Sequence, residues 1–424
     1  MTSTQRVVLL LFIASLFAGL VSGSTFYYRI AYLWIFLYVG SWAMSRLALR
    51  GVEFQRTARS LRSQVGQIFE ERYEVSNTSR LPRLWMEVRD ESGLPGARGS
   101  QVLSLIGGNE SRSYLVRTRL LERGVFPLGP TTIVSGDLFG LFQVSETYLA
   151  KDSLLVYPMM VDVEAFPSPI GWLSGGEALR RRTHQITPNA AGVRDYATGD
   201  PLNRIHWVST ARRNRLIVKE FELDPMAEVW IFVDASRFVQ AYLPYTPYLQ
   251  DDRDMWRPSL KIPLPPSTEE YAVSIAASLA RFYIQRGRAV GLVSAGSTFQ
   301  VLAAERGGRQ MGKILESLAL LRAQGKLPIQ GLIEAEVKNL PRGSTVIVIT
   351  PSTEDGALVS IELLGRRLMR PIAVLLNSIS FGGSGGTDKL AQSLELLSVP
   401  VIQVGNGDDL SAVLSSTAAS GLWV

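Results

Sequence analysis

The chain has 424 residues, of which 46% are hydrophobic and 19% are charged, and its formal net charge is +6. This length is more than one hydrophobic core usually serves, so it predicts two or three domains, and the apolar content excludes a disordered chain. The chain contains no cysteine and only two histidines, His184 and His206, which excludes disulfides, thiolate metal sites and multi-histidine metal sites.

The first fifty residues predict two membrane-spanning helices joined as a hairpin. Residues 7–28 contain no charged side chain and have the length of a membrane span, about 20 residues. Residues 30–44 form a second, aromatic-rich apolar stretch between Arg29 and Arg46, whose long side chains can reach the two interfaces. A cleaved signal peptide is the alternative for the first stretch, but the second apolar stretch follows at once and favours the hairpin.

Arginines flank the two outer ends of this hairpin, with Arg6 before it and a basic run over residues 46–62 after it. An excess of basic residues marks the cytoplasmic side of a membrane protein. We therefore expect a two-pass protein whose soluble body lies in the cytoplasm. We also expect the arginines of the basic run to lie against anionic lipid headgroups: Arg46, Arg50, Arg56, Arg59 and Arg62.

Residues 51–165 predict an antiparallel β-sandwich domain. Short apolar or alternating runs are separated by turn-forming residues such as Ser92-Gly93, at the spacing typical of sandwiches. The expected strands cover residues 67–75, 84–90, 113–122, 131–135 and 154–157.

Residues 192–222, GVRDYATGDPLNRIHWVSTARRNRLIVKEFE, concentrate basic, aromatic and turn-forming residues between two segments that predict separate domains. This stretch resembles the signature of the domain-of-unknown-function 58 family, a group of bacterial membrane-anchored proteins. The resemblance rests on Gly192, Arg194, Tyr196, Gly199, Asp200, Ile205, Trp207, Ala211, Arg212, Leu216, Lys219 and Glu220. It implies attachment to the bacterial inner (plasma) membrane, but no particular reaction, because the activity of the family is poorly defined.

A second motif resembles the same family. It lies in residues 123–142, where an arginine, a glycine and an aromatic lead to the sequence Asp-Leu-Phe-Gly-Leu-Phe at 137–142. Glycine allows a tight bend, and we expect Phe139, Leu141 and Phe142 to fill the core of the sandwich. A structural role is favoured because no nucleophile or metal ligand accompanies the motif.

Residues 225–424 predict a doubly wound α/β domain, with residues 166–224 as a signature and linker segment before it. Strand-like runs at 228–234, 289–294, 345–350, 372–376 and 399–404 alternate with helical patterns at 269–286, 310–322, 356–369, 389–397 and 410–419. Residues 298–302 fit a hairpin at the edge of a mostly parallel sheet. The order of these elements resembles a von Willebrand factor A-like domain.

That resemblance implies a magnesium site, because such domains hold Mg²⁺ with an Asp-x-Ser-x-Ser motif after the first strand and with a Thr and an Asp from later loops. Asp234 and Ser236 match the first motif, but Phe238 replaces its second serine. Residues 350–352 read Thr-Pro-Ser, so the later aspartate is missing there. We expect a degenerate site without metal or other cofactor, in which Asp234 and Ser236 are the ligands if Mg²⁺ binds.

A proline- and tyrosine-rich insertion follows the first strand of this domain, over residues 239–266. Open α/β sheets bind ligands at the carboxyl ends of their strands, so the insertion is expected over that edge. It fits a docking surface for a protein partner, formed by Tyr242, Tyr245, Tyr248 and Trp256. An exposed, solvated loop is the alternative.

Two functions remain open for the signature segment. The favoured one is structural: an ion network with Trp207 as a core anchor, in which Arg212 meets Asp200. The alternative is a catalytic cleft of a membrane-bound hydrolase, with Asp200 as base, His206 as proton shuttle and Arg212 as clamp. Nucleic-acid binding is not expected, because few aromatics accompany the arginines and the chain carries a membrane anchor.

We therefore expect a non-enzymatic, membrane-anchored scaffold or adaptor. The family resemblance implies association with MoxR-type AAA+ ATPases and with other A-domain proteins in an assembly or chaperone-like system. The partners expected are thus the lipid bilayer and these proteins.

Overall fold

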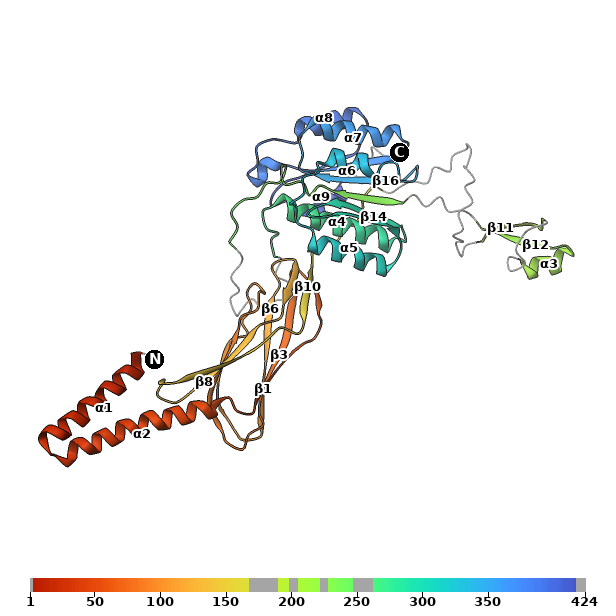
Figure 1. Cartoon of the computed structure of the whole chain (residues 1–424). Helices are drawn as coiled ribbons and strands as arrows, with labels where there is room; N and C mark the ends of the chain where they lie inside the picture. The colour runs from red at the N-terminus through yellow and green to blue at the C-terminus, as the bar shows by residue number, and fades with distance from the viewer. Residues whose placement is uncertain (1–2, 168–189, 198–204, 222–227, 247–261, 417–424) are drawn as a thin grey trace.

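The computed structural model describes residues 3–167, 190–197, 205–221, 228–246 and 262–416 (Figure 1). An apolar helix pair comes first, several β-sheets follow, and an α/β region built on a six-stranded sheet comes last. Figure 1 shows the sandwich between the helix pair and the α/β region. This order agrees with the sequence prediction.

The helix pair consists of α1 (Ser3–Ser22) and α2 (Thr25–Ala48). Both helices are long and apolar enough to cross a membrane by length and composition. Gly23 and Ser24 connect them: Gly23 adopts a φ of 65°, and Ser24 caps α2 by accepting a hydrogen bond from the Phe26 amide at 3.4 Å. Arg29 therefore lies inside α2 instead of between the two helices.

Two antiparallel sheets pack face to face in the sandwich. One has the order β1-β3-β6 and the other the order β5-β4-β8-β9. Their strands are β1 (Val52–Ala58), β3 (Ile68–Asn77), β6 (Glu110–Arg119), β4 (Arg83–Asp90), β5 (Gln101–Ile106), β8 (Thr131–Gly136) and β9 (Gln143–Tyr148). The core between them includes Tyr73, Val75, Met86, Val88 and Ile133, all fully buried.

The sequence did not predict β1, β5 and β9. Most positions of β5 and β9 are exposed, so these strands carry little of the alternating apolar pattern that marks a half-buried strand. A third, smaller sheet was also not anticipated: β2 (Arg62–Gln64), β10 (Ser153–Tyr157) and β7 (Gly124–Pro127), in the order β2-β10-β7. In it, β2 and β10 run parallel.

The prediction that the whole basic run lies on lipid is wrong for Arg56. This side chain is buried in the sandwich, where it pairs with Glu71 at 2.6 Å and with Asp90 at 3.1 Å. Arg59 and Arg62 lie further along the chain and approach Glu70 at 3.8 Å and Glu316 of the α/β region at 4.0 Å. The reason is that β1 leads away from the helix pair, so the arginines of the run lie at different heights along the sandwich.

The six-stranded sheet has the order β15-β14-β13-β16-β17-β18, and only β15 is antiparallel to its neighbour. This confirms the predicted mostly parallel sheet with a hairpin at one edge. The strands are β13 (Val229–Val233), β14 (Val290–Ala295), β15 (Phe299–Glu305), β16 (Thr345–Thr350), β17 (Arg370–Leu376) and β18 (Val401–Val404).

Helices cover both faces of this sheet. On one face, α4 (Thr268–Gln285), α5 (Gly308–Leu320) and α9 (Leu410–Ser416) pack in one core. On the other, α6 (Ile329–Glu336), α7 (Asp355–Arg366) and α8 (Asp388–Leu396) pack in a second core. The sequence prediction omitted α6, a short helix of eight residues.

The chain crosses from the sandwich to the α/β region along α4. The Ser278 hydroxyl donates to the Ser274 carbonyl oxygen within α4 at 2.6 Å and accepts a hydrogen bond from the Val161 amide at 2.9 Å. Arg281 of the same helix pairs with Asp162 at 2.5 Å. Phe166 then packs against Phe282 within the core of the α/β region. Residues 158–167 therefore form part of the surface and core of the α/β region.

Candidate functional site

The candidate site lies where the strand order of the six-stranded sheet reverses. The chain passes from β13 to β14 on one side of β13 and later returns to β16 on its other side. Open α/β sheets bind ligands in the crevice that forms at the carboxyl ends of two such strands. Asp234 directly follows β13, and Thr350 is the last residue of β16.

Asp234 is buried and hydrogen bonded through both carboxylate oxygens. Its Oδ2 accepts a hydrogen bond from the Thr350 hydroxyl at 2.6 Å, and its Oδ1 accepts one from the Ser236 amide at 3.0 Å. Burial raises the pKa of Asp234 to about 6, although the hydrogen bonds from Thr350 and Ser236 favour the ionised form and partly oppose this shift. The carboxyl group therefore changes its charge in a mildly acidic range.

The side chains around Asp234 do not fit a magnesium site. Both oxygens of its carboxylate already accept hydrogen bonds, and Phe238, at the position of the second serine, is exposed and offers no oxygen. The Ser236 hydroxyl is buried without a hydrogen-bond partner in the described part of the chain, which leaves one free oxygen ligand. Within that part, no group of three His, Cys, Asp or Glu side chains could hold a metal ion.

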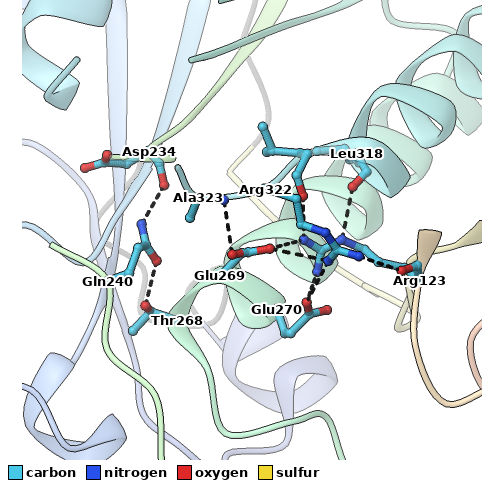
Figure 2. A network of polar contacts seen from close by, with 10 residues as sticks. Arg123, Asp234, Gln240, Thr268, Glu269, Glu270, Leu318, Arg322 and Ala323 are labelled. Atoms are coloured by element: carbon cyan, nitrogen blue, oxygen red, sulfur yellow. Dashed lines mark hydrogen bonds and ion pairs between the residues drawn. The ribbon is translucent and has the colours of Figure 1, made fainter. Parts of the chain in front are cut away.

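A chain of hydrogen bonds leads from Asp234 to the start of α4 (Figure 2). The Gln240 side-chain amide donates to the Asp234 carbonyl oxygen at 3.0 Å, and its Oε1 accepts from the Thr268 hydroxyl at 2.7 Å. The same hydroxyl accepts a hydrogen bond from the Ala241 amide at 3.0 Å. Thr268 is the first residue of α4, so the loop after β13 is fastened to the first turn of that helix.

The next two residues of α4, Glu269 and Glu270, bind Arg123 from the sandwich (Figure 2). The guanidinium of Arg123 is fully buried and contacts Glu269 at 2.5 Å. It also donates to the carbonyl oxygens of Leu318 at 3.2 Å and Leu321 at 2.8 Å, at the carboxyl end of α5. One side chain of the sandwich thus holds two helices of the α/β region.

A hollow of about 450 Å³ lies beside this contact. It is lined by residues 121–123 of the sandwich, by Arg322 after α5, and by the two ends of the insertion, residues 242–245 and 265–266. Ser267, Glu269 and Glu270 at the start of α4 complete the lining. Tyr242 is 76% exposed at this hollow, and Tyr245 also lines it. Tyr248 and Trp256, the other predicted docking residues, lie outside the described residues.

The signature segment forms β11 (Ala190–Asp195), α3 (Trp207–Arg213) and β12 (Ile217–Phe221). The two strands pair antiparallel, and the Tyr196 amide donates to the Leu216 carbonyl at 2.9 Å. Gly192 lies in β11, as does the backbone of Arg194, while Lys219 and Glu220 lie in β12. Gly199 and Asp200 lie outside the described residues, so the pairing of Asp200 with Arg212 stays a prediction.

His206 has a structural contact in this segment. It precedes α3, and its Nδ1 accepts a hydrogen bond from the Ser209 amide at 3.3 Å, which caps the helix. Trp207 is 67% exposed, so its prediction as a core anchor is wrong. Arg212 lies exposed in the last turn of α3, where a positive charge stabilises the helix end.

These observations define a protein with an apolar helix pair, a β-sandwich and an α/β region whose buried aspartate lies at the sheet's switch point. Residues 192–241 match the sequence model of the family described as "Protein of unknown function DUF58". This match, together with a relative of the same chain, supports the DUF58 family. A relative from Bacillus subtilis (strain 168), described as "Uncharacterized protein YeaD", is 23% identical over 255 residues, which are 58% of this chain and 56% of the relative. The match thus spans about half the length of that relative.

Solved structures add only weak likenesses. The CARDB domain of a Pyrococcus furiosus protein is 13% identical, with a TM-score of 0.20, over 25% of this chain and 91% of that chain. The cupredoxin domain of amoB from Nitrosocaldus yellowstonii is 11% identical, with a TM-score of 0.19, over 34% of this chain and 99% of that chain. Neither score carries an argument about fold or function.

The raised pKa of Asp234 predicts a pH-dependent contribution to stability. Because the folded-state pKa of about 6 exceeds the ordinary value of 3.8, this contribution is fully present below the lower value and is lost as pH rises through the higher one. Asp234→Asn removes it. Between pH 4 and pH 7, the free energy of unfolding of wild type should therefore fall relative to the variant by up to about 3 kcal/mol.

Denaturant unfolding of the full chain in detergent at several pH values measures this difference. Thr350→Val is the matched variant, since it removes a hydrogen bond that favours the ionised carboxylate and should steepen the fall. A pH-independent difference between wild type and Asp234→Asn would contradict the prediction.

The burial of Arg123 predicts that the sandwich and the α/β region depend on this contact. Arg123→Ala removes the buried partner of Glu269 and Glu270 and the donor to two helix-end carbonyls, and leaves Arg322, at 3.6 and 3.9 Å, as the remaining cation beside the two carboxylates. It should lower the free energy of unfolding by up to roughly 3–5 kcal/mol. Arg117→Ala is the control, because Arg117 pairs with Glu70 at 2.8 Å on the sandwich surface and should cost at most about 1 kcal/mol. Calorimetry of both variants measures these losses. An equal loss of unfolding free energy in the two variants would contradict the prediction.

Proposed function

We propose that this protein is a membrane-anchored scaffold whose α/β region binds protein partners on the cytoplasmic side. The apolar helix pair supports the anchor, and membership of the DUF58 family fits a membrane-associated protein. The arginines that flank the helix pair support the cytoplasmic orientation. In a bacterial cell this corresponds to a two-pass protein of the inner membrane.

The observation that carries the proposal is the contrast at the carboxyl edge of the sheet. Asp234 and Thr350 are buried and hydrogen bonded to each other, while the aromatic side chains of Phe238 and Tyr242 lie exposed nearby in sequence. Exposed aromatic side chains beside a hollow are typical of protein–protein contacts, where they supply most of the binding energy. This edge therefore suits a docking surface better than a reaction centre.

We further propose that the α/β region is a von Willebrand factor A-like domain. Its support is the antiparallel edge strand β15, together with Asp234 and Ser236 directly after the first strand of the sheet. On the resemblance of the sequence, we propose a MoxR-type AAA+ ATPase as a partner, and other A-domain proteins as further members of an assembly or chaperone-like system.

The alternative function, a hydrolase that uses Asp200, His206 and Arg212, gains no support from the described contacts. The imidazole of His206 is engaged as the cap of α3, and Arg212 lies exposed on that helix. The variant Asp200→Asn distinguishes the hydrolase from the scaffold. Loss of a substrate turnover with unchanged thermal stability would favour the enzyme over the scaffold.

The docking surface predicts a change in partner affinity. The double variant Tyr242→Ala and Tyr245→Ala should weaken binding of a purified MoxR-type ATPase to the full chain in nanodiscs by at least about tenfold, as expected for the loss of central aromatic residues. Titration in the presence of ATP measures this affinity. Phe299→Ala is the control, because Phe299 is an exposed aromatic on the edge strand β15. Equal affinities for both variants and wild type would contradict the docking surface.

The few oxygen ligands available around Asp234 predict how magnesium affects the thermal stability of the protein. Because the carboxylate is already hydrogen bonded and a second carboxylate does not join it within hydrogen-bonding distance in the described residues, millimolar Mg²⁺ should not raise the Tm of the full chain. A ligand that binds the native state must stabilise it. A rise in Tm that vanishes in Asp234→Ala would therefore establish a metal site and contradict the prediction.

A further inference from the structure

The loop between β8 and β9, residues 137–142, is shaped by a buried carboxylate. Asp137 accepts hydrogen bonds from the amides of Phe139 at 2.8 Å, Leu141 at 3.2 Å and Phe142 at 2.6 Å. Gly140 adopts a φ of 69°, which favours glycine over residues with a side chain. These bonds satisfy three backbone donors and hold the loop in one tight conformation.

The tip of this loop presents two large apolar side chains to the outside. Leu138 and Phe139 are each 61% exposed, whereas Leu141 is buried at 2%. The prediction that Phe139 fills the sandwich core is therefore wrong. A rigid loop that displays Leu and Phe side by side exposes apolar surface, which is favourable only if that surface is covered by a partner.

Contacts with the apolar helix pair indicate what covers it. The Gln5 side-chain amide of α1 donates to the Leu141 carbonyl oxygen at 2.6 Å, and the ring of Tyr38 of α2 meets the ring of Phe142 edge-on at 5.2 Å. Gln5 precedes Arg6, which marks the charged end of α1. The loop is therefore attached to the first turn of α1 and to the middle of α2.

The depth of these contacts follows from helix geometry. Counted from the turn at Gly23 and Ser24, Gln5 lies eighteen residues along α1 and Tyr38 fourteen along α2. At a rise of 1.5 Å per residue, the two contacts lie about 27 Å and about 21 Å from the turn, and so differ in height by about 6 Å. Both fall in the part of a span of about 20 residues that lies away from the turn, with Gln5 close to its end. Gln5 thus lies at the membrane boundary, the zone where Tyr and Trp side chains prefer to lie.

We propose that the loop 137–142 inserts Leu138 and Phe139 into the interfacial layer of the lipid bilayer beside the helix pair. This inference rests on the proposed membrane anchor. The apolar tips of the two side chains enter the boundary between headgroups and acyl chains, while Asp137 stays buried in the sandwich as the internal cap of the loop. The sandwich is then seated on the membrane at two points, the end of α2 and this loop.

The chain contains no cysteine, so single cysteines report on chosen positions without further substitutions. Phe139→Cys and, as a second position, Leu138→Cys carry a nitroxide label in the full chain, reconstituted into vesicles of phosphatidylcholine and phosphatidylglycerol. Collision with oxygen, which concentrates in lipid, and with a water-soluble nickel chelate measures the surroundings of each label. We expect oxygen-to-nickel ratios severalfold above those of a label in water.

Two further positions complete the experiment. Leu149→Cys is the matched control: Leu149 is 80% exposed and follows β9, about 20 Å along that strand from the loop. Phe17→Cys reports on the anchor itself, because Phe17 is exposed within the apolar stretch of α1. We expect a lipid-like ratio at 17 and a water-like ratio at 149.

The outcomes separate the loop from the anchor. Lipid-like values at 17 with water-like values at both 138 and 139 overturn the insertion and leave the anchor standing. Water-like values at 17 overturn the anchor and the insertion together. Labels at 138 and 139 that meet neither reagent indicate contact with protein, either a second copy or another chain, and also overturn the insertion.

Discussion

The buried guanidinium of Arg123 is the contact on which the arrangement of the soluble regions depends. A charge without water must be paired and hydrogen bonded, and this one finds Glu269 and Glu270 at the start of α4 and carbonyl oxygens at the end of α5. The helix dipoles stabilise both charges of this contact. The amino terminus of α4 stabilises the two carboxylates, and the carboxyl terminus of α5 stabilises the guanidinium. This arginine therefore anchors the sandwich to two helices of the α/β region.

The same turn of α4 also serves the candidate site. Thr268, Glu269 and Glu270 are consecutive, so the hydrogen bonds toward Asp234 and the ion pairs toward the sandwich come from one helical turn. Any movement of this turn alters both sets of contacts, because a helical turn moves as a unit. The hollow with Tyr242 lies at the same junction, so a partner bound there would contact residues of both regions.

At the other end of the sandwich, the connection to the helix pair is equally short. Only residues 49–51 separate α2 from β1, and the loop 137–142 touches both helices. The helix pair, the sandwich and the α/β region are thus joined by direct side-chain contacts as well as by the chain. Such a stack would hold the proposed docking surface at a set distance from the membrane, as the proposed scaffold requires.

The sequence by itself determined the elements whose burial is one-sided or complete. The apolar helix pair, the buried strands of the six-stranded sheet and its antiparallel edge could all be predicted, because the periodicity of apolar residues reports directly on local structure. Asp234 and Thr350 could be placed at the carboxyl edge for the same reason. The exposed strands β5 and β9 escaped prediction, since exposed positions impose little pattern on the residues that occupy them.

Only the tertiary structure decided which individual side chains are buried. Arg56 belongs to a run of arginines yet is enclosed by Glu71 and Asp90, while Phe139 and Trp207 are aromatic yet exposed. Arg123 carries no local signal that it would cross to another region and meet α4. The physical reason is the same in each case: burial depends on what packs across from a residue, and those partners lie far away in the sequence.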